Sequence, residues 1–133
     1  MPVLPGAKGK VELNMHEVLR ILAPRGTEQC MAVIEKVSAM PGQGVSSMFR
    51  FGEGYGALQM AIAGHRHTRH FVTPATWKKH FKLSRDKGVS RGLAIQRFPQ
   101  HAKLFARVKD DGRAEATLLA LYGQEILMKT EKA

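Results

Sequence analysis

Two short segments predicted to be strands, separated by a segment with helical periodicity, most constrain the fold of this chain. Residues 30–37 (CMAVIEKV) are apolar and β-branched and are bounded by polar residues, which predicts a buried strand. Residues 69–73 (RHFVT) predict a second short strand. Between them, apolar side chains recur at three- and four-residue steps from Met48 to Ile62, which predicts a helix. With three further helices predicted after residue 73, the order indicates an α/β fold.

Capping residues mark where the helices are expected to begin. Asn14, with Glu17 three residues later, predicts a capping box, and Thr73 before Pro74 predicts a helix start. Residues 1–4 and 11–13 are predicted to be short extended pieces around a Gly/Pro/Lys turn. Further N-caps are predicted at Ser46 or Ser47, at Ser84, and at Asp110 or Asp111.

Three glycines, Gly52, Gly54 and Gly56, lie within the predicted helix that starts near Met48. A glycine inside a helix costs about 1 kcal/mol relative to alanine. We therefore expect the backbone here to pack closely against the sheet or against a second subunit.

Length and composition limit the class of protein. A chain of 133 residues with 44% apolar and 24% charged residues predicts one globular domain over residues 1–133 and excludes a mainly disordered chain. No apolar run approaches the roughly 20 residues needed to cross a bilayer. The single cysteine, Cys30, excludes an internal disulfide framework and fits a reducing compartment, so a cytoplasmic location is expected.

The positive charge of the chain is concentrated in one segment. Residues 65–113 contain 13 Lys and Arg but three Asp and Glu. The net charge of this segment is therefore +10, the same as that of the whole chain. Such a segment predicts a surface that faces a polyanion, with nucleic acid the leading partner. A solvated basic face without a specific partner is the alternative, and an anionic membrane is less favoured because no strongly amphipathic helix is evident.

Acidic residues in unusual settings are candidates for chemistry. Glu35 ends a strand predicted to be buried, where a carboxylate needs a partner or a cation unless the strand has already reached solvent. Asp110, Asp111 and Glu115 begin the last predicted helix, with Asp111 and Glu115 on one face. Helix capping explains Asp110 and Asp111 without any function. Carboxylates beside a basic surface are also the groups that Mg²⁺ and a phosphodiester require together.

The histidines and the aromatic residues suggest weaker alternatives. His65, His67 and His70 have spacing seen in zinc sites, but two arginines accompany them and no acid or cysteine does, so a basic DNA-facing loop is preferred. An RNA-binding module would need aromatic side chains interleaved with the basic ones, and most of the nine aromatic residues are predicted to be in the core.

Four segments, in the same order along the chain, resemble the RuvC-type Holliday-junction resolvases, especially their phage and prophage relatives. The longest is IEKVSAMPGQGVSSMFRFGEGYGAL, residues 34–58. It is followed by FVTPATWKKHFKL (71–83), SRDKGVSRGLAIQRFP (84–99) and KDDGRAEATLLALYG (109–123). Together they fall within residues 30–123, about 70% of the chain.

The resemblance implies an RNase H-like fold, with a mixed sheet flanked by helices, and a homodimer. It implies an endodeoxyribonuclease that hydrolyses phosphodiesters in Holliday junctions or other branched DNA, with Mg²⁺ or Mn²⁺ held by acidic residues. Glu35 matches the family's acid at the end of a later strand, and Glu115 matches its final acid. Asp111 is the best match for the remaining acid on the last helix, with Asp110 as the alternative.

The basic residues of the same segments are the expected DNA contacts. They would bind the backbone in a salt-sensitive and largely sequence-independent way. These residues are Lys78, Lys79, Lys82, Arg85, Lys87 and Arg91.

The N-terminus departs from the family pattern. The family's first acid lies on a strand of the form IDPG, followed by a Gly-rich hairpin, and residues 1–13 contain no counterpart and only Glu12 as an acid. The chain therefore resembles an N-terminally shortened member. A non-catalytic DNA-binding or structural remnant of such a nuclease is the alternative function.

Overall fold

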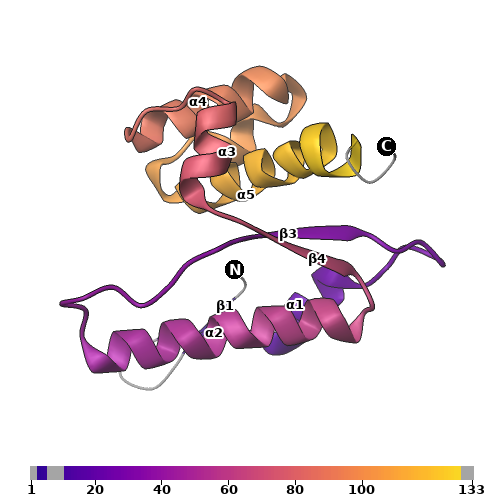
Figure 1. The fold of residues 1–133 in the computed structure, drawn as a ribbon, viewed down its shortest axis with the longest axis vertical. Helices are drawn as coiled ribbons and strands as arrows, with labels where there is room; N and C mark the ends of the chain where they lie inside the picture. Colours follow the sequence, from indigo (N-terminus) through magenta and orange to yellow (C-terminus); the bar gives the residue numbers. More distant parts are fainter. Residues whose placement is uncertain (1–2, 6–10, 130–133) are drawn as a thin grey trace. The chain divides into compact units, whose positions relative to one another are not determined.

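The computed structural model describes residues 3–5 and 11–129 (Figure 1). Within this part the fold is mixed α/β and mostly helical, which confirms the α/β expectation at that level. The elements, in chain order, are β1 (Val3–Pro5), β2 (Val11–Leu13), α1 (Met15–Leu22), β3 (Met31–Glu35), α2 (Val45–Gly64), β4 (Thr68–Val72), α3 (Pro74–His80), α4 (Lys87–Arg97), the 3₁₀ helices η2 (Pro99–Phe105) and η3 (Val108–Asp110), α5 (Asp111–Tyr122) and the π-helical η4 (Gly123–Leu127).

The described strands form two separate pairs. β1 and β2 are antiparallel, with Val3 opposite Leu13, and most of the predicted turn between them lies outside the described residues. β3 and β4 form a two-stranded parallel sheet. The Thr68 amide donates to the Cys30 carbonyl at 3.1 Å, and the Lys36 amide donates to the Val72 carbonyl at 2.8 Å. Strands were expected in all four places.

The chain divides into two compact units. Unit 1 comprises residues 1–32 and 38–70, and unit 2 comprises residues 33–37 and 71–133. The division passes through β3 and β4, so each unit has one end of their sheet. The expectation of one domain over the whole chain stays a prediction.

In unit 1, helix α1 packs against the long helix α2. The Asn14 side chain accepts a hydrogen bond from the Glu17 amide at 3.1 Å, so the predicted N-cap is confirmed. The reciprocal half of the capping box is wrong, because the Glu17 carboxylate binds Arg20 one turn later. The Arg20 guanidinium gives the Glu17 carboxylate a charge-assisted hydrogen bond, which is stronger than the hydrogen bond that the neutral Asn14 amide would give.

Helix α2 has the predicted position but begins and packs differently. It starts at Val45 after Gly44 without a side-chain cap, so the predicted serine caps are wrong. Apart from the neighbouring residues and backbone of the helix itself, no atom of the described residues lies within 4 Å of a Cβ built on Gly52, Gly54 or Gly56. Close packing of these glycines against the sheet is therefore not seen among the described residues, and packing against a second subunit stays a prediction.

Unit 2 is built around helix α5. One core cluster unites β4, α3 and α5 through Val72, Trp77, Leu118, Leu119 and Tyr122. Trp77 and Leu118 are completely buried. A second cluster joins α4, η2 and α5, and it consists of Ala94, Phe105 and Ala114.

The caps of α3 and α4 fix where these two helices of unit 2 begin. Thr73 caps α3 and Pro74 occupies the first turn, as expected. The predicted cap of α4 at Ser84 is wrong, because the Asp86 carboxylate accepts from the Gly88 amide at 2.9 Å. The Ser84 hydroxyl accepts instead from the Asp86 amide at 3.3 Å, which holds the connection between α3 and α4.

Candidate nucleic-acid interface

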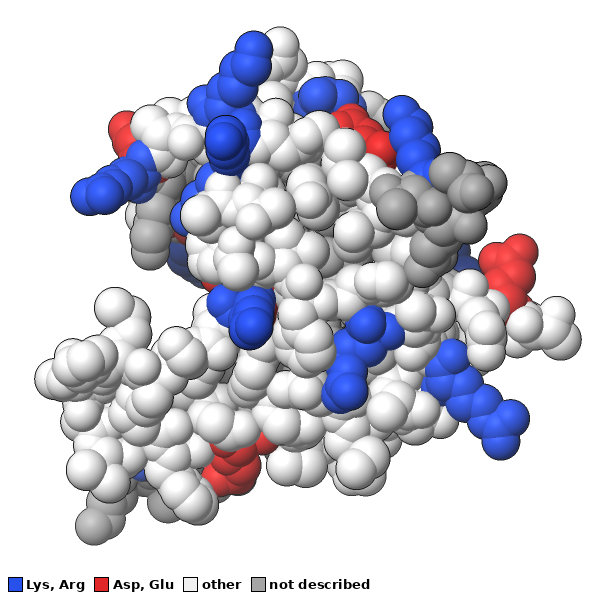
Figure 2. All heavy atoms as spheres, viewed as in Figure 1, with Lys and Arg blue, Asp and Glu red and all other residues white. Residues whose placement is uncertain are grey.

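Unit 2 holds most of the positive charge. Its sequence contains 14 Lys and Arg and seven Asp and Glu, a net charge of +7 out of +10 for the chain. Over the helices of unit 2, more Lys and Arg side chains than Asp and Glu side chains are visible in Figure 2. A surface with this imbalance attracts polyanions at long range.

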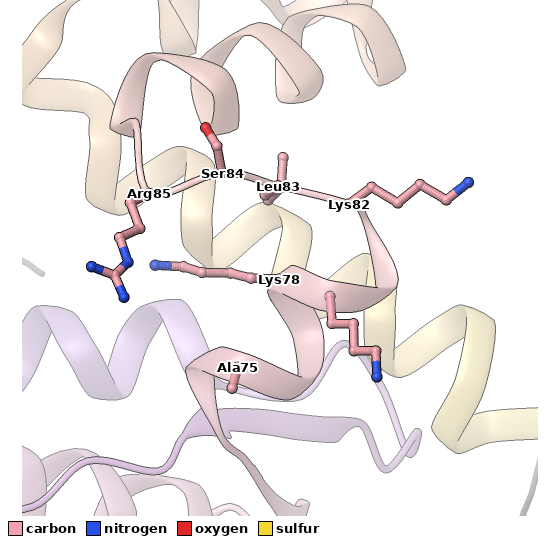
Figure 3. A pocket seen from close by; sticks show the side chains of 7 residues that line it. Ala75, Lys78, Lys82, Leu83, Ser84 and Arg85 are labelled. Atoms are coloured by element: carbon pink, nitrogen blue, oxygen red, sulfur yellow. The ribbon is translucent and has the colours of Figure 1, made fainter.

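Four predicted DNA-contacting residues line one open hollow formed by α3 and the connection from α3 to α4, with a volume of about 640 Å³. We name it the α3–α4 hollow. In Figure 3 the side chains of Lys78 and Arg85 extend to the same side, and that of Lys82 extends to the opposite side. Within the described part of the chain, Lys79, Lys82 and Arg85 have no acidic partner. The lining residues are Ala75, Lys78, Lys79, Lys82, Leu83, Ser84 and Arg85.

Arg91, another predicted contact, does not line this hollow. The side chain of Lys87 lies outside the described residues. The Arg91 Nε donates to Asp111 Oδ1 at 2.7 Å, and its Nη1 donates to the Ala106 carbonyl at 3.4 Å. Arg91 therefore joins α4 to the start of α5.

The backbone at the end of α3 holds Lys82 in an unusual conformation. Its φ of 55° lies in the left-handed region, where a side chain other than that of glycine is strained. The Lys82 amide donates to the Lys79 carbonyl and the Leu83 amide donates to the Lys78 carbonyl, which is a Schellman motif. A lysine at the usual glycine position keeps a cation at the edge of the hollow.

Glu35 is held by a buried tryptophan. The Trp77 Nε1 donates to Glu35 Oε2 at 2.8 Å, and Trp77 is 0% exposed. A buried indole N–H and a half-buried carboxylate each require a partner, and here each satisfies the other. The Glu35 carboxylate therefore has a partner in the protein, and the alternative of a carboxylate that is only solvated is wrong.

Asp110 forms a tight local pair with Arg107. Its carboxylate accepts from the Arg107 amide at 3.0 Å and from the guanidinium at 3.0 and 3.2 Å. These hydrogen bonds hold the pKa of the Asp110 carboxyl below its ordinary value. The Asp110 side chain therefore satisfies the amide of Arg107 at the start of η3. It does not cap α5, although Asp110 is the residue before that helix.

Asp111 and Glu115 lie in the first two turns of α5 and have basic partners from other helices. Asp111 binds Arg91, as described above. Glu115 Oε1 lies 3.8 Å from the Lys78 Nζ. Both carboxylates are half-buried.

The four predicted metal ligands do not form a ligand set in this structure. Mg²⁺ needs several oxygen ligands around one point. Carboxylates have the right chemistry, but each of the four has its own nitrogen donor. Among the described residues, no group of three or more His, Cys, Asp and Glu side chains is placed to hold a metal ion. In this arrangement each carboxylate is bound by a nitrogen donor of the protein, and the expectation of Mg²⁺ or Mn²⁺ stays a prediction.

The histidines of unit 1 support its own packing. His65 Nε2 bonds to the Leu19 carbonyl at 2.9 Å, and His67 Nε2 bonds to the Leu22 carbonyl at 2.6 Å. The Cys30 amide donates to His67 Nδ1 at 3.2 Å. His67 is buried, so the expectation that it belongs to a DNA-facing loop is wrong. Both of its ring nitrogens are used, and they join the end of α1 to Cys30, the residue before β3.

Trp77 and Arg107 were not predicted to be partners of the acids. Arg107 was detectable, because it precedes Asp110 by three residues. Trp77 is 42 residues from Glu35. The available signal was that the only tryptophan of the chain would need an acceptor once buried.

Comparison with known proteins gives no family assignment. No protein-family model matches the chain, and no curated protein sequence matches it significantly. Among the described residues, no helix is both long enough and apolar enough to cross a membrane.

Replacing Lys82 by glycine should stabilise the protein. Lys82→Gly relieves the left-handed strain, and we expect the free energy of unfolding to rise by about 0.5–1 kcal/mol. The matched control, Lys79→Gly in helix α3, should lower it by about 1 kcal/mol. Urea unfolding measures both changes. A loss of stability in Lys82→Gly would show that the lysine side chain makes a larger contribution than the backbone strain removes.

The contacts of Glu125 make the stability of unit 2 depend on pH. Its carboxylate binds His80 Nε2 at 2.8 Å and Arg97 Nη1 at 3.3 Å, and the hydrogen bond with His80 is the largest cause that holds its pKa below the ordinary value of 4.5. Its contribution to stability is therefore present above pH 4.5 and is lost as the pH falls through the lower pKa of the folded state.

Glu125→Gln removes this titration. We expect the variant to be less stable at neutral pH, and its free energy of unfolding to fall less steeply below about pH 4.5. Urea unfolding between about pH 3 and pH 7 measures the difference. The part of the acid dependence that comes from Asp110 should remain in both proteins. Equal slopes for the variant and the wild type would contradict the role of Glu125.

Proposed function

We propose that this protein binds the phosphodiester backbone of DNA with the α3–α4 hollow. We further propose that it is a RuvC-type, RNase H-like endonuclease that cuts branched DNA such as Holliday junctions with Mg²⁺ or Mn²⁺, as a homodimer in the cytoplasm. The observation on which the proposal depends is that four predicted DNA contacts, Lys78, Lys79, Lys82 and Arg85, line one hollow.

The hollow has the chemistry of a backbone-binding surface. Its polar lining consists of three lysines, one arginine and one serine, and no acidic residue lines it. Lysine binds phosphate as a mobile point charge, and arginine adds a planar donor fork. No aromatic side chain lines it on which a base could stack, so binding that is independent of sequence is expected.

The positions of the acids support the endonuclease proposal. The resemblance implies one acid at a strand end and two on the last helix. Glu35 is the last residue of β3, and Asp111 and Glu115 lie in the first two turns of α5. All three belong to unit 2, the unit that contains the hollow.

A second candidate function is DNA binding without cleavage. It is favoured by the partners of the acids, because Trp77, Arg91 and Lys78 occupy positions around Glu35, Asp111 and Glu115 that cations would need. Cleavage would require these contacts to change, whereas binding in the hollow would not.

Binding and cleavage of a labelled four-way DNA junction test both functions. We expect the chain to bind the junction in EDTA, with an affinity that falls steeply with salt. In Mg²⁺ we expect symmetric nicks near the crossover. Glu35→Gln should bind normally and cleave at least about a hundredfold more slowly, since Gln keeps an oxygen for Trp77 but loses the charge. Glu53→Gln, an exposed residue of α2, is the control and should cleave normally.

Each contrary result identifies the part of the proposal that is wrong. Binding without cleavage by the wild type would establish the second candidate. Normal cleavage by Glu35→Gln would remove Glu35 from the site. The absence of junction binding at low salt would contradict both candidates.

A further inference from the structure

Lys78 both lines the α3–α4 hollow and contacts an acidic residue. It lines the α3–α4 hollow, and its Nζ lies 3.8 Å from Glu115 Oε1 on α5. It also lies 5.4 Å from the centre of the neighbouring Trp77 ring. Within the described residues, it is the one cation of the hollow that also has an acidic partner.

The contact between Lys78 and Glu115 is weak enough to be exchanged. The distance exceeds that of a charge-assisted hydrogen bond, which is typically about 2.7–2.9 Å. The two side chains are 34% and 27% exposed, so water screens the pair. An ion pair of this exposure changes an equilibrium by a factor of at most about five.

A phosphate in the hollow would be the stronger partner for Lys78. It would face the cation of Arg85 together with that of Lys78, because the two side chains extend to the same side of the hollow (Figure 3). Lysine rotates freely about its four-carbon stem and can turn from Glu115 to an incoming anion. The pairing with Glu115 opposes this movement, because it favours the unbound position of Lys78.

We propose that Glu115 competes with the DNA backbone for Lys78, so that DNA binding separates the ion pair and frees the Glu115 carboxylate. The contact is thus an autoinhibitory one. This inference rests on the proposed DNA binding by the hollow. It adds that the affinity for DNA and the state of a predicted active-site acid are coupled through one lysine.

A double-mutant cycle on DNA affinity tests the competition. The four proteins are the wild type, Glu115→Gln, Lys78→Gln and the double variant, and the probe is a synthetic four-way junction in EDTA, so that no cation contributes. We expect Glu115→Gln to raise the affinity of the wild type about twofold to fivefold. The same change should have little effect in the Lys78→Gln protein.

A matched cycle with Lys79 controls for general electrostatics. Lys79 lines the same hollow and has no acidic partner among the described residues. We expect Glu115→Gln to raise the affinity of Lys79→Gln as much as it raises that of the wild type. Circular dichroism of each variant checks that the fold is retained.

Three results would overturn the inference. An equal gain from Glu115→Gln with and without Lys78 would show that the carboxylate only repels DNA at a distance. A loss of affinity in Glu115→Gln would show that it orients Lys78 for DNA. If Lys78→Gln alone leaves DNA affinity unchanged while the wild type binds, Lys78 is not a DNA contact. A wild type that does not bind the junction would instead contradict the proposed function itself.

Discussion

The burial of Trp77 is the interaction on which the arrangement of unit 2 depends. Its ring packs with Val72 and Leu118 and is completely buried, which joins β4, α3 and α5 in one core. Truncation of a residue buried in this way typically costs about 3–5 kcal/mol. Its indole N–H binds Glu35 at the end of β3, so the same residue also sets the position of a candidate acid. Lys78 follows Trp77 on α3, so the burial of Trp77 also fixes the helix from which the first cation of the hollow extends.

A second constraint is that unit 2 has twice as many basic as acidic residues. Each acid of unit 2 that the structure describes accepts a hydrogen bond or ion pair from within the unit, as the contacts of Asp86, Asp110, Asp111 and Glu125 illustrate. The surplus cations are left to face solvent, and several of them gather in the α3–α4 hollow. The gathering of cations lowers stability at Lys82, because this residue adopts a strained left-handed backbone that glycine would adopt more easily.

Local features of the structure were predictable from the sequence, and distant contacts were not. The caps at Asn14 and Thr73 follow from a side chain and an amide three residues apart. The clustering of its cations was predictable because Lys78, Lys79, Lys82 and Arg85 lie within one short segment, but the hollow itself was not predicted. The cap of α4 was misplaced because Ser84 and Asp86 can both accept a hydrogen bond, and the charged acceptor is the stronger. The partners of Glu35, Asp111 and Glu115 depend on which elements pack together, and spacing along the chain does not contain that information.

The most direct test of the central claim, that the α3–α4 hollow binds the DNA backbone, is a titration of the ¹⁵N-labelled chain with a short DNA duplex followed by NMR. The account predicts chemical-shift changes that are largest at the amides of residues 75–85 and that diminish as salt is added. Helix α1 should show little change. Shifts confined to unit 1, or no shifts in residues 75–85 while DNA binds, would contradict it.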